Sequence, residues 1–409
     1  MSNTYFVTGA AGFIGANFVN HLIDKYSQNV EITIFDSLTY AGNLESIASL
    51  LQLPNVRFVK ADICDPVAVA EALAHSNPDF IVNFAAESHV DRSIENPKLF
   101  LETNIIGTQT LLEAARRLWC EGSDEAGRPK YRSGVKFLQI STDEVYGSLA
   151  KDFEAPQPLH LTEDVGRVVQ GRDHLITYGW NFFVESTPLA PRSPYSASKT
   201  SADLIVLAYR ETYGLPINIT RCSNNYGPYQ FPEKLIPLII NNILEGKKLP
   251  VYGKGENIRD WLYVEDHCKA IDMVISQGAD GCIYNVGGHN ERQNIQIVKI
   301  IIKTIHDLME QEPQFRTLLK KQDQDAEGNI RIDWINDDLI TFIKDRLGHD
   351  QRYGIDPSKI KEDLGWYPET TFEVGIVKTI RWNLEHHDWV EAVSGDDYQK
   401  YYENMYGKK

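Results

Sequence analysis

Short apolar runs alternate with longer segments of helical spacing along the first half of the chain. Strands are predicted at residues 4–8, 31–35, 56–60, 80–84, 135–140 and 216–222, and helices at residues 13–26, 99–118 and 195–213. Repeated alternation of strand and helix is typical of a parallel sheet that carries helices on both faces. The pattern therefore predicts an α/β fold with a doubly wound parallel sheet.

The alternation breaks down after about Asn225, where proline and glycine become frequent. We therefore expect residues 1–225 to form the sheet domain and residues 226–409 mainly a smaller C-terminal lobe, with chain exchange between the two. Residues 121–133 are polar and contain glycine and proline, which is typical of a surface insertion. Residues 151–191 and 310–345 are irregular, and a lid, an oligomer contact and a neutral insertion are all compatible with them.

Charge and cysteine content narrow the range of partners. The 409 residues include 57 acidic and 41 basic side chains, for a formal charge of -16, and an acidic chain repels nucleic acid. The five cysteines are widely spaced, so neither a disulfide framework nor a metal site is predicted. The N-terminus shows no signal-peptide pattern, and no apolar run reaches the roughly 18 residues that cross a bilayer. These features predict a cytoplasmic protein without membrane or nucleic-acid partners.

A glycine-rich turn, G-A-A-G-F-I-G, follows the first predicted strand and opens the first predicted helix. Gly9, Gly12 and Gly15 would let the backbone approach a pyrophosphate, and the helix N-terminus offers free N–H groups. Asp36 ends the second strand roughly 20 residues further on, where an acid hydrogen-bonds a ribose 2′-hydroxyl. That acid would repel a 2′-phosphate, so NAD is favoured over NADP. Asp62 ends the third strand, where it either contacts the adenine or is a simple loop acid.

The G-x-x-G-x-x-G spacing resembles the extended short-chain dehydrogenase/reductase family, which implies an NAD-binding Rossmann fold, tightly bound NAD and a Tyr-x-x-x-Lys pair. The chain contains Y-S-A-S-K, which places Tyr195 and Lys199 on one face of a predicted helix. A nearby ammonium and the positive nicotinamide are expected to lower the pKa of the tyrosine from about 10, making the phenolate available as a base. A surface Tyr/Lys pair on an amphipathic helix is the alternative.

Two acids, Asp143 and Glu144, follow the strand at residues 135–140 in the stretch S-T-D-E-V-Y-G. That strand ends at the carboxyl edge of the predicted sheet, where folds of this class bind ligands. One acid kept protonated and one kept ionised could remove a proton and expel water. The alternative is a turn that Asp143 caps, with Glu144 exposed to solvent.

A closer resemblance, to the sugar-nucleotide 4,6-dehydratases of that family, rests on S-T-D-E-V-Y-G, A-A-E-S-H-V-D-R-S, P-Y-S-A-S-K, N-N-Y-G-P-Y-Q-F-P-E-K-L-I-P and R-D-W-L-Y-V-E-D-H. It runs from Gly9 to about Asn294, with a further match at residues 345–349. It implies that dTDP-glucose is converted to a 4-keto-6-deoxy sugar nucleotide and water, in the biosynthesis of dTDP-L-rhamnose and other deoxysugars. The implied steps are oxidation at C4, elimination of water across C5 and C6, and hydride return to C6. A homodimer is also implied, and two-fold dimers are the commonest assembly.

The resemblance implies catalytic roles for Thr142, Asp143, Glu144, Tyr195 and Lys199. Tyr195 would deprotonate the 4-hydroxyl with the help of Thr142. Glu144 would remove the C5 proton while Asp143 protonates the departing 6-hydroxyl. NAD is regenerated in each cycle, so the net reaction is that of a lyase.

Binding residues also follow from the resemblance. The implied NAD site comprises Gly9, Gly12, Phe13, Ile14, Gly15, Asp36, Ser37, Thr39, Asp62, Ile63, Ala85, Ala86, Thr103, Tyr195, Lys199 and Asn225. The implied substrate site, expected mainly in the C-terminal lobe, comprises Ser88, Thr142, Asn224, Lys234, Leu235, Pro250, Tyr252, Arg259, Asn294, Asp345 and His349. The Arg259 guanidinium can fork onto diphosphate oxygens, although an ion pair with Asp260 is the alternative. Asn104 could be a structural helix residue, and Lys234 could be a solvated surface charge.

Two other functions are compatible with parts of the pattern. An epimerase or decarboxylase on the same fold would use the same turn and Tyr/Lys pair, although the 4-epimerases of the family lack the acid pair. A non-catalytic NAD-sensing or scaffold protein would need the turn alone, and it would gain nothing from Thr142, Asp143, Glu144, Tyr195 and Lys199.

Overall fold

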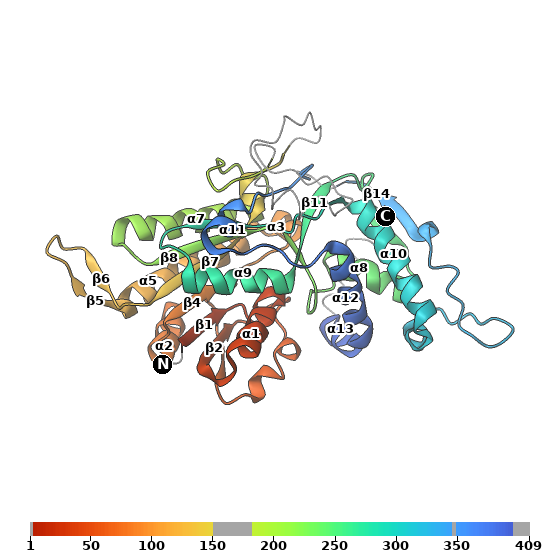
Figure 1. Cartoon of the computed structure of the whole chain (residues 1–409), viewed down its shortest axis with the longest axis horizontal. Helices are drawn as coiled ribbons and strands as arrows, with labels where there is room; N and C mark the ends of the chain where they lie inside the picture. The colour runs from red at the N-terminus through yellow and green to blue at the C-terminus, as the bar shows by residue number, and fades with distance from the viewer. Residues whose placement is uncertain (1–2, 150–181, 346–348, 396–409) are drawn as a thin grey trace.

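The computed structural model describes residues 3–149, 182–345 and 349–395. Its main sheet has seven strands in the order β12-β8-β7-β4-β1-β2-β3, and neighbouring strands pair in parallel throughout. The strands are β1 (Asn3–Thr8), β2 (Val30–Asp36), β3 (Val56–Lys60), β4 (Phe80–Asn83), β7 (Lys136–Thr142), β8 (Ile217–Cys222) and β12 (Ile283–Val286). The predicted doubly wound parallel sheet is confirmed (Figure 1).

Helices cover both faces of this sheet. One face carries α1 (Phe13–Tyr26), α9 (Val264–Gln277) and α11 (Ser358–Leu364), and the other carries α2 (Pro66–Ser76), α5 (Thr108–Trp119) and α7 (Pro194–Tyr213). Side chains alternate along β1, so Tyr5 and Val7 enter the first core while Phe6 enters the second. Because successive side chains point to opposite faces, a strand covered by helices on both faces needs apolar residues at consecutive positions.

Two elements differ from their predicted form. The helix expected at residues 99–118 consists of α4 (Pro97–Leu101), a π-helical segment η4 (Glu102–Gly107) and α5. The strand expected at residues 135–140 continues through Ser141 and Thr142, which are both buried. Asp143 therefore begins a 3-10 helix, η5 (Asp143–Tyr146), directly at the sheet edge.

The seventh strand, β12, lies well beyond residue 225 and pairs with β8. The helix α9 also returns to the first lobe, where it packs against α1. The predicted passage of chain between lobes is therefore observed. The division of the chain at residue 225 stays a prediction.

The C-terminal lobe surrounds a second apolar core. It contains the mixed sheet β13-β11-β9, the parallel pair β10-β14 and the helices α8, α10, α12 and α13. Their bounds are β9 (Asn224–Tyr226), β10 (Leu249–Tyr252), β11 (Ile258–Tyr263), β13 (Glu291–Gln293), β14 (Ile340–Ile343), α8 (Leu235–Leu244), α10 (Asn294–Gln311), α12 (Phe372–Glu385) and α13 (His387–Val393). None of the helices in the described residues is both long and apolar enough to span a membrane.

The segments predicted as insertions differ in structure. Residues 121–133 belong to a hairpin of β5 (Cys120–Ser123) and β6 (Pro129–Tyr131), which projects from the first lobe as the prediction of a surface insertion requires (Figure 1). Residues 310–345 contain η6 (Pro313–Leu318), η7 (Asp337–Leu339) and β14. Of the segment 151–191, only residues 182–191 are described. Short connecting helices are η1 (Ser27–Asn29), η2 (Leu44–Ser46), η3 (Leu50–Gln52) and α3 (Val90–Glu95).

Candidate active site

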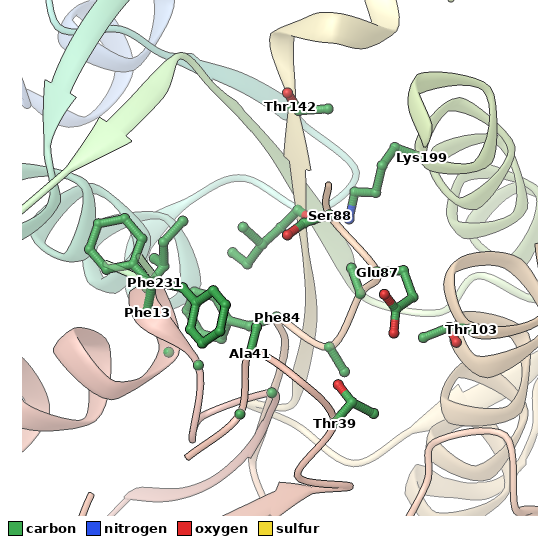
Figure 2. A pocket seen from close by; sticks show the side chains of 18 of the residues that line it. Phe13, Thr39, Ala41, Phe84, Glu87, Ser88, Thr103, Thr142, Lys199 and Phe231 are labelled. Atoms are coloured by element: carbon green, nitrogen blue, oxygen red, sulfur yellow. Dashed lines mark hydrogen bonds between the residues drawn. The ribbon is translucent and has the colours of Figure 1, made fainter. Parts of the chain in front are cut away.

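A cavity of about 350 Å³ opens at the carboxyl edge of the main sheet. Its walls come from the β1–α1 turn, from the residues that follow β2, β3, β4, β7 and β8, and from α7. Every residue predicted to bind NAD lines this cavity, and so do Thr142, Asp143 and Glu144. Figure 2 shows Lys199 reaching toward Ser88, with Glu87 and Thr103 on one side and Phe13 and Phe231 on the other.

The glycine turn is built for close backbone approach. Gly9 has a φ of +66°, and a Cβ added there would lie 2.6 Å from the backbone nitrogen of Ala85. A Cβ on Gly15 would lie 2.6 Å from the carbonyl oxygen of Gly9. Gly12 precedes α1 and has no side chain to cap it, so the first-turn N–H groups remain available to an anion. This donor set fits the diphosphate of a dinucleotide.

Asp36 connects the second strand to the glycine turn. Its two carboxylate oxygens accept hydrogen bonds from the backbone nitrogens of Ala11, at 2.9 Å, and Leu38, at 2.8 Å. Burial raises the pKa of Asp36, and these two backbone donors oppose the rise. The carboxylate also lines the cavity, where it can accept a hydrogen bond from a ribose hydroxyl. The residues present therefore fit NAD.

The Tyr/Lys pair lies on the cavity side of α7. Ser193 caps this helix in a capping box with Ser196, and a proline follows at the first helical position. Tyr195 is only 8% exposed, and the Lys199 ammonium donates a hydrogen bond of 2.6 Å to the carbonyl oxygen of Ile140. The alternative of a surface Tyr/Lys pair is therefore wrong.

The expected fall in the pKa of Tyr195 is not what the chain alone produces. Burial raises this pKa well above its usual range, and the nearby Glu144, Cys222 and Asp143 raise it further. Burial also lowers the pKa of Lys199, an effect that Asp203 opposes. The prediction rested on the lysine ammonium and the nicotinamide, whereas two acids at the end of β7, Asp143 and Glu144, act on the same phenol and raise its pKa.

The acid pair occupies the start of η5. The Thr142 hydroxyl caps this short helix by accepting from the backbone nitrogen of Glu144, and it donates to the Asp143 carboxylate, both at 3.3 Å. Thus Thr142, and not Asp143, is the capping residue. Asp143 is 2% exposed, and its Oδ2 has no hydrogen-bond partner among the described residues. Glu144 is half-buried and faces the cavity.

The pKa of Asp143 is raised well above that of an ordinary carboxyl group. Burial is the main cause, the negative charges of Glu144 and Asp260 add to it, and Arg259 opposes it. Two neighbouring acids in unequal surroundings hold their protons differently, which is the usual basis for an acid and a base in one site. The direction of this pKa shift favours the protonated form of Asp143.

The predicted substrate residues divide into two groups. Ser88, Thr142, Asn224 and Lys234 line the cavity, and the Lys234 ammonium donates to the carbonyl oxygen of Ser88 at 3.2 Å. Lys234 is therefore not a free surface charge. The others belong to the C-terminal lobe and do not line the cavity; they are Leu235, Pro250, Tyr252, Arg259, Asn294, Asp345 and His349. The rings of Tyr252 and His349 lie 6.2 Å apart, His349 pairs with Asp345 at 2.6 Å, and residues 346–348 lie outside the described ranges.

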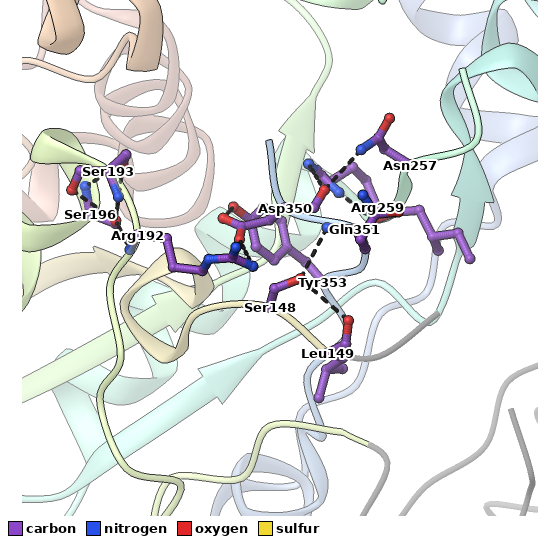
Figure 3. A network of polar contacts seen from close by, with 11 residues as sticks. Ser148, Leu149, Arg192, Ser193, Ser196, Asn257, Arg259, Asp350, Gln351 and Tyr353 are labelled. Carbon is purple, nitrogen blue, oxygen red and sulfur yellow. Dashed lines mark hydrogen bonds and ion pairs between the residues drawn. The ribbon is translucent and has the colours of Figure 1, made fainter. Parts of the chain in front are cut away.

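Arg259 lies close enough to the acid pair to act on Asp143, and a network of polar contacts surrounds it (Figure 3). Its guanidinium donates to the carbonyl oxygens of Ile258, at 2.7 Å, and Asp350, at 3.0 Å, and packs 4.1 Å from the ring centre of Tyr353. The alternative partner, Asp260, instead accepts from the backbone nitrogens of Gly288 and Asn290.

Some residues that line the cavity were not predicted from the sequence. Glu87 and Glu233 both line the cavity, and Arg92 donates to Glu233 at 3.1 Å while its guanidinium lies 3.9 Å from the ring centre of Tyr40. Burial raises the pKa of Glu87, and Arg92 opposes this. Both glutamates sit inside the motifs quoted for the resemblance, A-A-E-S and P-E-K, so a signal was present.

Asn104 takes the structural role. It is buried, and its amide donates to the carbonyl oxygen of Glu87, at 3.0 Å, and to the hydroxyl of Ser198, at 2.8 Å. The same side chain accepts from the backbone nitrogen of Glu87 at 2.8 Å. Asn104 thereby joins the loop after β4 to the catalytic helix α7.

The fold and the cavity define an extended short-chain dehydrogenase/reductase whose usual Tyr/Lys pair is joined by two acids. The family model described as GDP-mannose 4,6 dehydratase matches residues 6–160 and 178–379. The chain belongs to this family.

Full-length relatives carry a more specific name. The chain is 48% identical to a dTDP-glucose 4,6-dehydratase of Escherichia coli over 392 residues, which is 96% of both chains. It is 46% identical to the Shigella flexneri protein of the same name over 400 residues, or 98% of both chains.

Solved structures agree with these relatives. A dTDP-glucose 4,6-dehydratase from Bacillus anthracis in complex with NAD is 40% identical, with a TM-score of 0.73 and coverage of 96% of this chain and 100% of that one. The Streptomyces venezuelae enzyme of the same name is 38% identical, with a TM-score of 0.74 and coverage of 95% and 99%. A UDP-glucose 4-epimerase from Thermotoga maritima, at 23% identity and a TM-score of 0.69, shares the fold.

Proposed function

We propose that the acid pair and the Tyr/Lys pair of this cavity together dehydrate a sugar nucleotide. The reaction is that of dTDP-glucose 4,6-dehydratase, an NAD-dependent hydro-lyase reaction that converts dTDP-D-glucose to dTDP-4-keto-6-deoxy-D-glucose and water in deoxysugar biosynthesis. The observation that carries the proposal is the position of Asp143 and Glu144, which share one cavity with Tyr195 and Lys199. Bound NAD supplies the acceptor, and later the donor, of one hydride.

The proton transfers are assigned to this chain's own side chains. Tyr195 takes the proton of the 4-hydroxyl, with the Thr142 hydroxyl beside it and Lys199 held against β7. A ketone at C4 acidifies the C5 proton, which Glu144 removes. Asp143 donates its proton to the 6-hydroxyl, which leaves as water. Lys234 and Arg259 are the assigned contacts of the substrate diphosphate, because the Lys234 ammonium lines the cavity and the charge of Arg259 reaches Asp143.

The protonation of Asp143 predicts a pH dependence for water loss. Elimination needs the protonated acid, and burial keeps Asp143 protonated to higher pH than an ordinary carboxyl group. The rate of elimination should therefore fall as the pH rises through the elevated pKa of Asp143. Stopped-flow measurement of product formation across pH would record this fall. An Asp143→Asn variant cannot donate that proton, so its elimination rate should be lower and should no longer fall with rising pH. If the rate of the variant falls over the same pH range as that of the wild type, the titrating group is not Asp143.

The product distinguishes dehydration from the competing chemistry. Incubation with dTDP-glucose should yield a 4-keto-6-deoxy sugar nucleotide, which absorbs near-ultraviolet light in alkali. Formation of dTDP-galactose would instead establish a 4-epimerase. Absence of turnover despite bound NAD would revive the sensing or scaffold function.

We also propose a homodimer, formed through the surface of η4, α4 and α7. Large apolar side chains are exposed there, including Leu101, Ile106 and Leu204, which are 46%, 53% and 53% exposed. Their burial against a second copy would remove apolar area from water. Sedimentation velocity should give twice the mass of one chain, and a monomer at micromolar concentration would contradict the proposal.

The location of the protein and its avoidance of nucleic acid remain proposals. A reducing cytoplasm is supported by the five cysteines, none of which forms a disulfide. The acidic charge of the chain supports the expectation that nucleic acid is not a partner. Localisation of a tagged full-length chain and a filter-binding assay with duplex DNA would test the two statements.

A further inference from the structure

Two walls of the NAD cavity lie far from each other in the sequence. One wall is the loop after β2, where Thr39, Ala41 and Gly42 line the cavity. The other is the loop before α8, where Gln230 and Phe231 line it. The ring of Phe231 meets that of Tyr40 at 5.8 Å, so the two walls touch at the cavity itself.

Both walls begin at a residue with unfavourable backbone geometry. Leu38 and Tyr229 have φ angles of +54° and +64°, which large side chains rarely adopt. Such a conformation persists only where the surroundings hold it in place. The Leu38 backbone nitrogen is held by Asp36. Tyr229 carries a large side chain that disfavours a positive φ, so we infer that packing contacts of its ring stabilise this backbone conformation.

Those contacts come from the C-terminal helices α12 and α13. The ring of Tyr229 packs edge-on against Trp382, at 4.8 Å, and Trp389, at 5.7 Å. The two tryptophans also pack against each other at 5.2 Å. We call Tyr229, Trp382 and Trp389 the aromatic latch.

The aromatic latch also reaches the first wall. The indole nitrogen of Trp389 donates to the hydroxyl of the buried Ser46 at 3.2 Å. Ser46 belongs to η2, which follows the first wall, and its backbone nitrogen donates to Asn43. The Asn43 nitrogen in turn donates to the Ala11 carbonyl in the glycine turn. Figure 1 shows α12 and α13 beside the lobe that carries α1.

We propose that the aromatic latch holds the two walls together and thereby slows the escape of bound NAD. None of its three residues is among the described residues that line the cavity, so they are positioning residues. A latch of this kind suits a reaction in which the cofactor is regenerated in place and has no need to leave between turnovers.

The exchange of bound NAD tests this role directly. Purified holoenzyme would be mixed with radiolabelled NAD, and the exchange rate would be measured by filtration. Trp382→Ala removes the ring closest to Tyr229 and should speed exchange by about tenfold. Trp389→Phe keeps a ring but removes the hydrogen bond to Ser46, and it should speed exchange by about threefold. The rate of turnover with saturating NAD should stay near that of the wild type.

Trp366→Phe is a matched control. The indole of Trp366, like that of Trp389, donates a hydrogen bond within the protein, here to the Asp266 carbonyl at 3.1 Å, but Trp366 does not line the cavity. This variant should exchange NAD at the wild-type rate even if its melting temperature falls. The proposal is overturned if Trp389→Phe and Trp366→Phe lose similar thermal stability and both exchange NAD as the wild type does. That comparison decides the matter even if Trp382→Ala does not fold.

Discussion

Glu144→Gln is expected to leave oxidation at C4 intact while it stops the loss of water. The amide fills the space of the carboxylate but cannot accept the C5 proton, so the elimination step should slow by roughly 10²–10⁴-fold. Mixing the variant with dTDP-glucose should produce a persistent absorbance at 340 nm. The reduced cofactor can return its hydride to C6 only after water has been lost, and that loss is blocked in the variant. In the wild-type enzyme the same signal should be transient.

Deuterated water separates the roles of the two acids. The wild-type product should carry deuterium at C5, because the proton that leaves is replaced from solvent. Asp143→Asn should still exchange the C5 proton of enzyme-bound sugar without expelling the 6-hydroxyl, whereas Glu144→Gln should not exchange it. Normal water loss in Glu144→Gln would assign the base to another residue, and Glu87 would be the first to examine because it lines the same cavity.

Tyr195→Phe is expected to block the reaction one step earlier. The phenyl ring can keep the packing against Phe100, whose ring centre lies 6.3 Å away, so the fold should survive. Without the hydroxyl, no base stands at the 4-hydroxyl, and turnover should fall by about 10³-fold. No absorbance at 340 nm should appear, which distinguishes this variant from Glu144→Gln.

Tyr284→Phe provides the comparison for that variant. Tyr284 is fully buried in β12, and its hydroxyl has no hydrogen-bond partner among the described residues. Tyr284→Phe removes the same atom, a phenolic oxygen, from a residue that does not line the cavity, so turnover should stay within about twofold. If Tyr195→Phe reduced NAD at a normal rate, the assignment of the first base would fail.

Local patterns predicted the first lobe well because its elements are long or strictly periodic. The bounds of α1 and β3 are those predicted, residues 13–26 and 56–60. β12 was missed because four residues, I-Y-N-V, carry too little periodicity, and their strand form depends on the free edge of β8. The π-helical segment η4 was missed for a different reason: its apolar spacing is that of any helix, and the wider turn depends on packing.

The sequence predicted many of the residues that line the cavity, but it did not predict the direction of the pKa shift of Tyr195. The spacing of Tyr195 and Lys199 sets which face of α7 they share, and this follows from the sequence alone. The pKa of Tyr195 depends on which groups approach from β7, and those are brought in by the sheet. The same limit applies to Glu233 and Arg92, since their pairing joins α3 to the loop before α8 across a sequence distance that no local pattern spans.

The position of β12 also bears on how the chain is made. The sheet of the first lobe ends at β8 until residues 283–286 have left the ribosome, and an unpaired strand offers its backbone groups to any other strand nearby. The nascent first lobe therefore waits for more than 60 further residues after β8 before its sheet is complete. Pairing between distant segments of this kind slows folding. Both lobes therefore depend on one late step, the pairing of β12 with β8. A fragment that ends at residue 225 would lack β12 and would expose the unpaired edge of β8.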